Sequence, residues 1–121
     1  MITTLLFIIF IHWISDFVFQ TQKMSMNKSK NNYWLTMHVF VYTLITASAW
    51  MVYFALDFIY IPFLAVFLIF ALHWITDYIT SRITSKLYAK GDYHNFFVVI
   101  GFDCFLHYCQ LFLIYKYLIV K

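Results

Sequence analysis

The sequence predicts an all-α membrane protein, a bundle of four transmembrane helices built as a tandem repeat of two helical hairpins. Of its 121 residues, 64% are hydrophobic and only 11% are charged, whereas soluble domains carry about 25% charged residues. Two nearly identical pentapeptides, HWISD at 12–16 and HWITD at 73–77, lie in separate apolar runs. We therefore expect a single transmembrane domain over 1–121, made of two related halves.

Four apolar segments are each long enough to cross the hydrocarbon core, which takes about 20 helical residues. We predict the spans at about 1–20, 33–55, 58–80 and 96–119. The first segment lacks the basic start and the small-residue cleavage site of a signal peptide, and it carries His12 and Asp16. We expect it to remain in the mature protein.

The connections between these spans differ in charge. The segments 21–32 and 81–95 hold six basic residues, Lys23, Lys28, Lys30, Arg82, Lys86 and Lys90, whereas the turn near Asp57 and Pro62 has none. By the positive-inside tendency, both basic loops face the cytoplasm and both termini face outside. The loops also account for the net charge of +3, so we expect contact with membrane lipid and no nucleic-acid partner.

Seven ionisable side chains lie inside the predicted spans, where a charge is expensive. They are His12, Asp16, His38, His73, Asp77, Asp103 and His107. Residues four apart share one face of a helix, so three spans each present a His/Asp pair and the remaining span presents a histidine. The helical rise of about 1.5 Å per residue puts all seven at similar depth, in the half of the bundle nearer the basic loops. We expect one shared polar centre.

A metal ion would explain this centre. Three ionised aspartates would together cost about 8–10 kcal/mol on the insertion scale, and a divalent cation neutralises carboxylates while accepting neutral imidazoles as ligands. Mixed His/Asp ligation favours zinc, then iron or manganese. Seven candidates exceed one tetrahedral shell, so we expect one or two ions, with some residues supporting the ligands. A metal-free hydrogen-bond network and a proton path remain as alternatives.

The function we expect is that of a membrane-embedded, metal-dependent hydrolase acting on a lipid or another amphiphile from the cytoplasmic side. Asp16, Asp77 and Asp103 would act as further ligands or as the base for a metal-activated water. Arg82 would steady a substrate phosphate or developing negative charge. Two alternatives are a metal-ion or proton transporter working as a homo-oligomer and a non-catalytic phage or host membrane factor with a structural metal site.

Motifs along almost the whole chain carry a resemblance. They are H-W-x-x-D-F-x-x-Q (12–20), N-K-S (27–29), H-V-x-x-Y (38–42), H-W-x-x-D-Y-x-T-S (73–81), S-K (85–86), H-x-F-F (94–97) and D-x-x-x-H (103–107). The pattern resembles an uncharacterised family of small integral-membrane proteins of bacteria and their phages. The resemblance implies a multi-pass protein of the bacterial inner membrane and carries no activity. The site is also similar in kind to the membrane-embedded zinc site of alkaline ceramidases, although the order of motifs differs.

Overall fold

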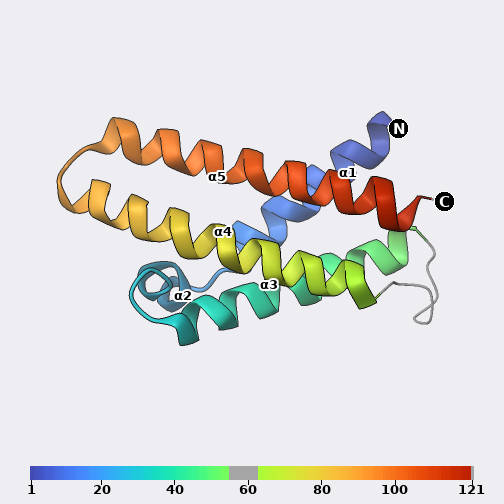
Figure 1. Ribbon diagram of the computed structural model, residues 1–121, viewed down its shortest axis with the longest axis horizontal. Helices are drawn as coiled ribbons and strands as arrows, with labels where there is room; N and C mark the ends of the chain where they lie inside the picture. The colour runs from blue at the N-terminus through green and yellow to red at the C-terminus, as the bar shows by residue number, and fades with distance from the viewer. Residues whose placement is uncertain (55–62, 121) are drawn as a thin grey trace.

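The computed structural model describes residues 1–54 and 63–120, and these residues form helices joined by short connections (Figure 1). The elements in chain order are α1 (Ile2–Trp13), a π-helical segment (Ile14–Val18), α2 (Gln22–Asn27), α3 (Asn32–Tyr53), α4 (Phe63–Ala89), α5 (Tyr93–Ile114) and a second π-helical segment (Tyr115–Ile119). No strand occurs within the described ranges. The prediction of an all-α fold is confirmed.

Three helical stretches are long and apolar enough to cross a membrane. They are α3, α4 and the continuous stretch Tyr93–Ile119 formed by α5 and the second π-helical segment. A shorter apolar stretch, Ile2–Val18, combines α1 with the first π-helical segment. Its length of about 25 Å approaches the 30 Å or so of a hydrocarbon core. The chain therefore has the character of a helical membrane protein, as the sequence predicts.

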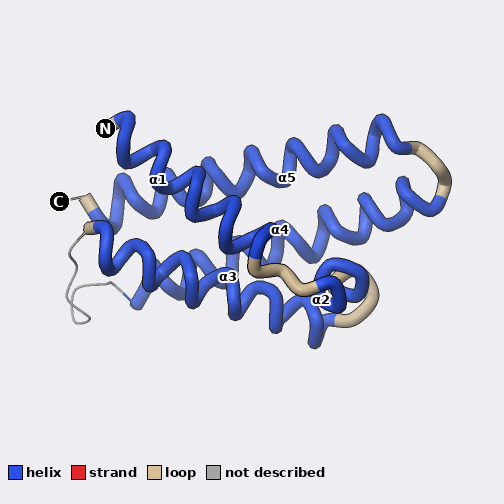
Figure 2. Tube along the Cα trace, turned by 180° about the vertical axis from the view of Figure 1, so that it is seen from behind, coloured by secondary structure: helices blue, strands red, loops and turns tan. Residues whose placement is uncertain are grey.

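The helices form a bundle with two distinct ends. α4 and α5 make an antiparallel hairpin, α3 packs along α4, and α1 crosses against α3 and α5 (Figures 1 and 2). Both termini lie at one end, whereas α2 and the turn between α4 and α5 lie at the opposite end (Figure 1). The basic segments 21–32 and 81–95 are therefore on the same end of the molecule.

α4 extends well beyond the predicted end of its span at residue 80. It continues to Ala89, and only residues 90–92 connect it to α5. Residues 81–89 contain no proline or glycine to end the helix, and the Thr84 hydroxyl donates to the Ser81 carbonyl of its own helix at 3.1 Å. The polar residues here show where the helix leaves the apolar region, and they do not end it. The segment 81–95, which the sequence predicts as a loop, is largely helical.

The turn into α5 is defined by two residues. Gly91 has a φ of +73°, a conformation that glycine adopts without strain. The Asp92 side chain then caps α5 by accepting a hydrogen bond from the backbone N–H of Asn95 at 3.2 Å. The Asn95 side chain donates to the same carboxylate, and this hydrogen bond lowers the pKa of Asp92. α5 consequently begins at Tyr93, three residues before the predicted start of the last span at 96.

Some of the sequence predictions fall on undescribed residues. The turn near Asp57 and Pro62, the predicted start of the third span at 58, and Lys121 all lie outside the described ranges.

Polar and apolar side chains are distributed as in a protein surrounded by lipid. Among the described residues, large apolar side chains such as Phe10, Phe67 and Phe102 are exposed at 54–64%. The buried polar side chains are His12, Ser15, Asp16, His38, Thr43, Thr46, His73, Thr76, Asp77, Thr80, Ser81 and His107. A compact apolar core lies toward the termini, formed by Ile8, Tyr42, Trp50, Ala65, Ile69, Leu111 and Ile114. The interior of the other half is therefore polar, and the surface is apolar.

Candidate metal centre

The polar interior begins where α1 changes to a π-helical segment. Phe19 N–H donates to the carbonyl of Ile14, five residues back, at 3.0 Å. Ser15 donates to the Ile11 carbonyl at 2.8 Å and accepts from the Thr46 hydroxyl at 3.2 Å, which ties this segment to α3. Single π-helical turns are frequent at functional sites because they change the direction of side chains within a helix. Here the widened turn contains Asp16, which is only 4% exposed.

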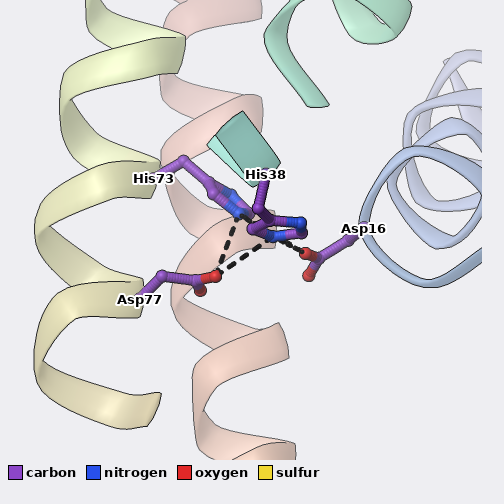
Figure 3. Close-up of side chains that lie close together, drawn as sticks. All are labelled: Asp16, His38, His73 and Asp77. Atoms are coloured by element: carbon purple, nitrogen blue, oxygen red, sulfur yellow. Dashed lines mark hydrogen bonds and ion pairs between the residues drawn. The ribbon is translucent and has the colours of Figure 1, made fainter. Parts of the chain in front are cut away.

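Four side chains from three parts of the chain meet at one point (Figure 3). Asp16 follows α1, His38 comes from α3, and His73 and Asp77 come from α4. His38 Nε2 lies 3.0 Å from Asp16 Oδ1 and 3.2 Å from Asp77 Oδ2. His73 Nε2 lies 3.4 and 3.5 Å from the same two oxygens, and 3.3 Å from His38 Nε2. We call these four residues the first ligand set.

These separations match the edges of a coordination tetrahedron. Zinc binds imidazole nitrogen and carboxylate oxygen at about 2.0–2.2 Å, which places neighbouring tetrahedral ligands about 3.3–3.6 Å apart. The five separations listed above run from 3.0 to 3.5 Å. The first ligand set is thus already close to the geometry that a tetrahedral divalent ion requires.

Hydrogen bonds alone do not satisfy these atoms. The two Nε2 atoms of His38 and His73 face each other at 3.3 Å, so a proton between them can belong to only one ring. Asp16 Oδ1 is buried and has no hydrogen-bond partner among the described residues, although it lies 3.0 Å from His38 Nε2. Buried polar groups of this kind are normally paired. A cation at their common centre would satisfy all four side chains at once.

A second group of side chains lies against the first. His12 Nε2 is 3.4 Å from Asp16 Oδ2, and His107 Nδ1 is 3.8 Å from the same oxygen. His107 also lies near two other carboxylates, with Nε2 3.6 Å from Asp77 Oδ1 and Nδ1 3.5 Å from Asp103 Oδ2. Both ring nitrogens of His12 and of His107 are buried without a hydrogen-bond partner in the described structure. The centre therefore continues from the first ligand set toward α5.

A cavity connects this centre with the end of the bundle that carries α2. Its volume is about 630 Å³, and its acidic lining comes from Asp16, Asp77 and Asp103. Hydroxyl groups line it further out, from Ser25, Ser29, Thr80, Ser81, Thr84 and Ser85. Its apolar lining comes from Phe17, Met26, Tyr88, Phe96 and Ile100. Asp103, which is 15% exposed, is fixed there by a 2.6 Å hydrogen bond from the Thr80 hydroxyl.

Lys28 reaches into this cavity from the end of α2. Its Nζ donates to Asp77 Oδ2 at 3.1 Å, and its side chain is 19% exposed. Burial disfavours the charged amine, but the carboxylates of Asp77 and Asp16 outweigh that effect and raise the pKa of Lys28 above its usual value. The lysine therefore stays charged beside the acidic groups. The N-K-S motif at 27–29 is the sequence signal for this residue.

Arg82, the cation that the sequence favours for this role, lies elsewhere. Its guanidinium donates to the Asn32 side chain at 2.8 Å and to the Tyr78 carbonyl at 3.0 Å, and it covers the Tyr78 ring at 3.6 Å. It does not line the cavity. The reason is helical geometry, because residue 82 lies five positions after Asp77 and so on a different face of α4.

The structure brings together all seven residues that the sequence places in the polar centre. Each belongs to at least one of three overlapping groups of potential metal ligands. The first group is Asp16, His38, His73 and Asp77, the second is His12, Asp16 and His107, and the third is Asp77, Asp103 and His107. The remaining histidine, His94, is exposed near the start of α5. Buried His/Asp groups that could bind a metal are therefore a property of this fold.

Fold and site together define a class of protein: a small helical membrane protein with a buried His/Asp centre open to one end of the bundle. The chain belongs to the family described as "Protein of unknown function (DUF3307)", whose model matches residues 2–121. The predicted resemblance to an uncharacterised family is thereby confirmed. No curated protein and no solved structure matches the chain.

Proposed function

We propose that the protein is a membrane-embedded, metal-dependent hydrolase that acts on an amphiphile with an anionic head group. The observation that carries the proposal is the first ligand set, whose four ligand atoms have near-tetrahedral spacing at the inner end of a cavity. Zinc suits this set best and iron or manganese next, because all three accept mixed imidazole and carboxylate ligands.

A bound divalent ion would act as a Lewis acid and make water a better nucleophile near neutral pH. The chain's own residues supply the remaining functions. Asp103 lies at the cavity wall with one oxygen bonded to Thr80, so its other oxygen is available to take a proton from the attacking water. Lys28 supplies a positive charge close to Asp77 and can attract an anionic group. The water oxygen would bond to the phosphorus or carbonyl carbon of the substrate ester while the bond from that atom to the leaving oxygen breaks, and Asp103 would pass the proton taken from water to the leaving oxygen.

The cavity lining supports an amphiphilic substrate. One part presents hydroxyls and lysines, which bind phosphate or other anionic groups, and another part presents aromatic and aliphatic side chains, which suit an acyl or prenyl chain. Both parts lie at the end of the bundle that carries the basic segments. With those segments in the cytoplasm, as the positive-inside tendency predicts, the substrate would enter from the cytoplasmic leaflet.

The fold we propose in the membrane has four spans, with Ile2–Val18 as the first. This stretch contributes His12 and Asp16 to the same centre as the three longer helices, so it must lie at the same depth. The pairs His12/Asp16 and His73/Asp77 approach His38 and His107 from opposite sides of the centre, which supports a tandem repeat of two hairpins. Both termini would then face outside.

Transport is less well supported than hydrolysis. A carrier needs a polar route to both sides of the membrane, whereas the apolar core of Ile8, Trp50, Ile69 and Leu111 packs between the centre and the end that carries the termini. The lining of the described cavity, in contrast, comes from residues of α2 and from the halves of α4 and α5 nearer to their connecting turn. A one-sided cavity fits an enzyme that takes its substrate from one leaflet.

The test is a hydrolysis assay on the purified protein in detergent. Protein loaded with zinc, manganese or iron(II) is mixed with micelles of phosphatidylglycerol, phosphatidylethanolamine or a polyprenyl phosphate, and the products are identified by mass spectrometry. We expect a metal-dependent product from at least one anionic amphiphile. Loss of a general base typically lowers the rate by about 10²–10⁴-fold, so Asp103→Asn should do the same.

The matched control is Asp92→Asn, because Asp92 is a half-buried aspartate that caps α5 and does not line the cavity. This variant should keep full activity. Absence of any metal-dependent product from the three lipids, in protein shown to contain metal, would argue against hydrolysis and favour a structural metal site.

A further inference from the structure

The two oxygens of Asp16 face different pairs of histidines. Oδ1 lies 3.0 and 3.4 Å from the Nε2 atoms of His38 and His73, both in the first ligand set. Oδ2 lies 3.4 Å from His12 Nε2 and 3.8 Å from His107 Nδ1. A carboxylate that presents one oxygen to each of two histidine pairs has the arrangement of a bridge between two ions.

Hydrogen bonding does not account for the second histidine pair in the described structure. His12 is completely buried and His107 is 1% exposed, yet none of their four ring nitrogens has a hydrogen-bond partner there. The distances from His12 and His107 to Asp16 Oδ2 exceed those of good hydrogen bonds and are near the ligand separations of about 3.3–3.6 Å around a tetrahedral ion. His12 Nε2, Asp16 Oδ2 and a His107 nitrogen thus form a three-atom ligand group.

Two further carboxylates lie beside this group. Asp77 has Oδ2 in the first ligand set, while its Oδ1 is 3.6 Å from His107 Nε2. Asp103 Oδ2 is 3.5 Å from His107 Nδ1, and Asp103 lines the cavity. A second ion beside His107 would therefore lie close to a carboxylate in the cavity wall. An open coordination position of this ion, on the side of the cavity, could receive water or substrate.

We propose that the centre binds two divalent transition-metal ions bridged by Asp16. The first ion lies among Asp16 Oδ1, His38, His73 and Asp77 Oδ2. The second lies among His12, Asp16 Oδ2 and His107, with its open coordination position on the side of Asp103 and the cavity. This proposal rests on the metal centre of the proposed function. It adds that the substrate is an ester of an oxyanion such as phosphate, since paired ions stabilise both the attacking and the leaving oxygen in its displacement.

The experiment measures metal content and magnetic coupling, neither of which requires a substrate. The detergent-purified protein is loaded with Mn²⁺ alone and desalted, its metal is quantified by mass spectrometry, and electron paramagnetic resonance spectra are recorded. We expect about two equivalents and an exchange-coupled spectrum, as a carboxylate bridge between ions about 3.5–4 Å apart predicts. His12→Ala and His107→Ala should each retain one equivalent and give the six-line spectrum of isolated Mn²⁺.

His94→Ala, which removes an exposed histidine, is the matched control and should keep both equivalents. If His12→Ala does not fold, the metal content of His12→Gln and the spectrum of the wild type test whether the second ion binds. One equivalent with a six-line spectrum in the wild type would overturn the second ion and leave a mononuclear hydrolase intact. A wild-type protein that binds no Mn²⁺, Zn²⁺ or Fe²⁺ would overturn this proposal and the proposed function together.

Discussion

The ring of Tyr42 lies face to face with the imidazole of His73, with ring centroids 3.7 Å apart and planes 21° apart. The opposite face of His73 is covered by His107, whose ring centroid is 4.1 Å away. The His73 ring is therefore held between two rings whose planes lie within 21° of its own, and only its edge is free to point Nε2 at Asp16 and Asp77. Tyr42 is itself buried, so it has no room to move aside.

Two substitutions of Tyr42 should separate the effect of ring stacking on metal affinity from the effect of the hydroxyl group. Tyr42→Phe keeps the aromatic face and should bind metal nearly as tightly as the wild type. Tyr42→Leu removes the flat surface that orients His73, and we expect metal affinity to fall by about 10-fold or more, the usual size of effects from residues that support ligands. Competition with a metal indicator measures both. Equal affinity in the two variants would contradict the orienting role of Tyr42.

Removing His38 should remove the first ion. His38 Nε2 lies closer than His73 Nε2 to both carboxylates of the first ligand set, so His38→Ala leaves His73 as the one histidine of that set shared by Asp16 and Asp77. We expect the purified variant to lose at least one metal equivalent relative to the wild type. Elemental analysis after identical loading checks this. Metal content unchanged from the wild type would show that the ion lies elsewhere.

Chelation should lower the stability of the folded protein. An ion that binds only the native state stabilises it by about 2.7 kcal/mol when its concentration is 100 times Kd. Treatment with a strong chelator should therefore lower the thermal unfolding midpoint in detergent, and added zinc should restore it. The shift should be smaller in Asp77→Asn, which lacks a charged ligand of the first set. An equal shift in that variant would mean that the chelator acts through another site.

Lys28 should contribute to binding of an anionic substrate, whereas Lys23 should not. Lys28 lines the cavity and pairs with Asp77, whereas Lys23 is exposed on α2. A hydrogen bond to a charged group contributes about 1.5–3 kcal/mol, so Lys28→Ala should raise KM for an anionic amphiphile by about 10-fold or more. KM for an uncharged analogue should change little. Equal effects of Lys28→Ala and Lys23→Ala on KM would mean that both lysines act through non-specific electrostatic attraction to the membrane.

Reporter fusions should place the two ends of the bundle on opposite sides of the membrane. We expect a reporter inserted in the turn at 90–92 to be active only if it functions in the cytoplasm, and one fused after Lys121 only if it functions outside. The basis is the six basic residues that lie at the α2 end of the molecule. A cytoplasmic reporter active after Lys121 would reverse the orientation and move the cavity to the outer leaflet.

The helices and the convergence of seven polar residues could be predicted because both leave strong patterns in the sequence. A histidine followed four residues later by an aspartate inside an apolar run fixes a shared face, and depth follows from counting residues along a helix. The end of α4 could not be placed in the same way. Thr80 and Thr84 look polar enough for a loop, but the Thr80 hydroxyl donates to Asp103 and the Thr84 hydroxyl to its own helix, which continues to Ala89.

Two local features of the site also could not be predicted from the sequence pattern. The π-helical turn around Asp16 depends on contacts such as that between Ser15 and Thr46, which lie on different helices. The placement of Lys28 depends on how α2 folds back under the bundle, and nothing in the spacing of a polar loop fixes that direction. Arg82 was favoured because it follows Asp77 closely in sequence, although helical rotation directs it to Asn32.

The ligand groups come from every long part of the chain, and this has a consequence for biosynthesis. Asp103 and His107 lie on α5, which leaves the ribosome after α1, α3 and α4, and the first ligand set already joins the segment after α1 with α3 and α4. Membrane helices can insert one by one before they associate. Until α5 has docked, the histidines and aspartates of the earlier helices must be protonated, hydrated or paired with each other. Loading of the second ion would therefore be the final step of maturation, and a chain truncated before α5 could be distinguished from a finished one by its failure to retain that ion.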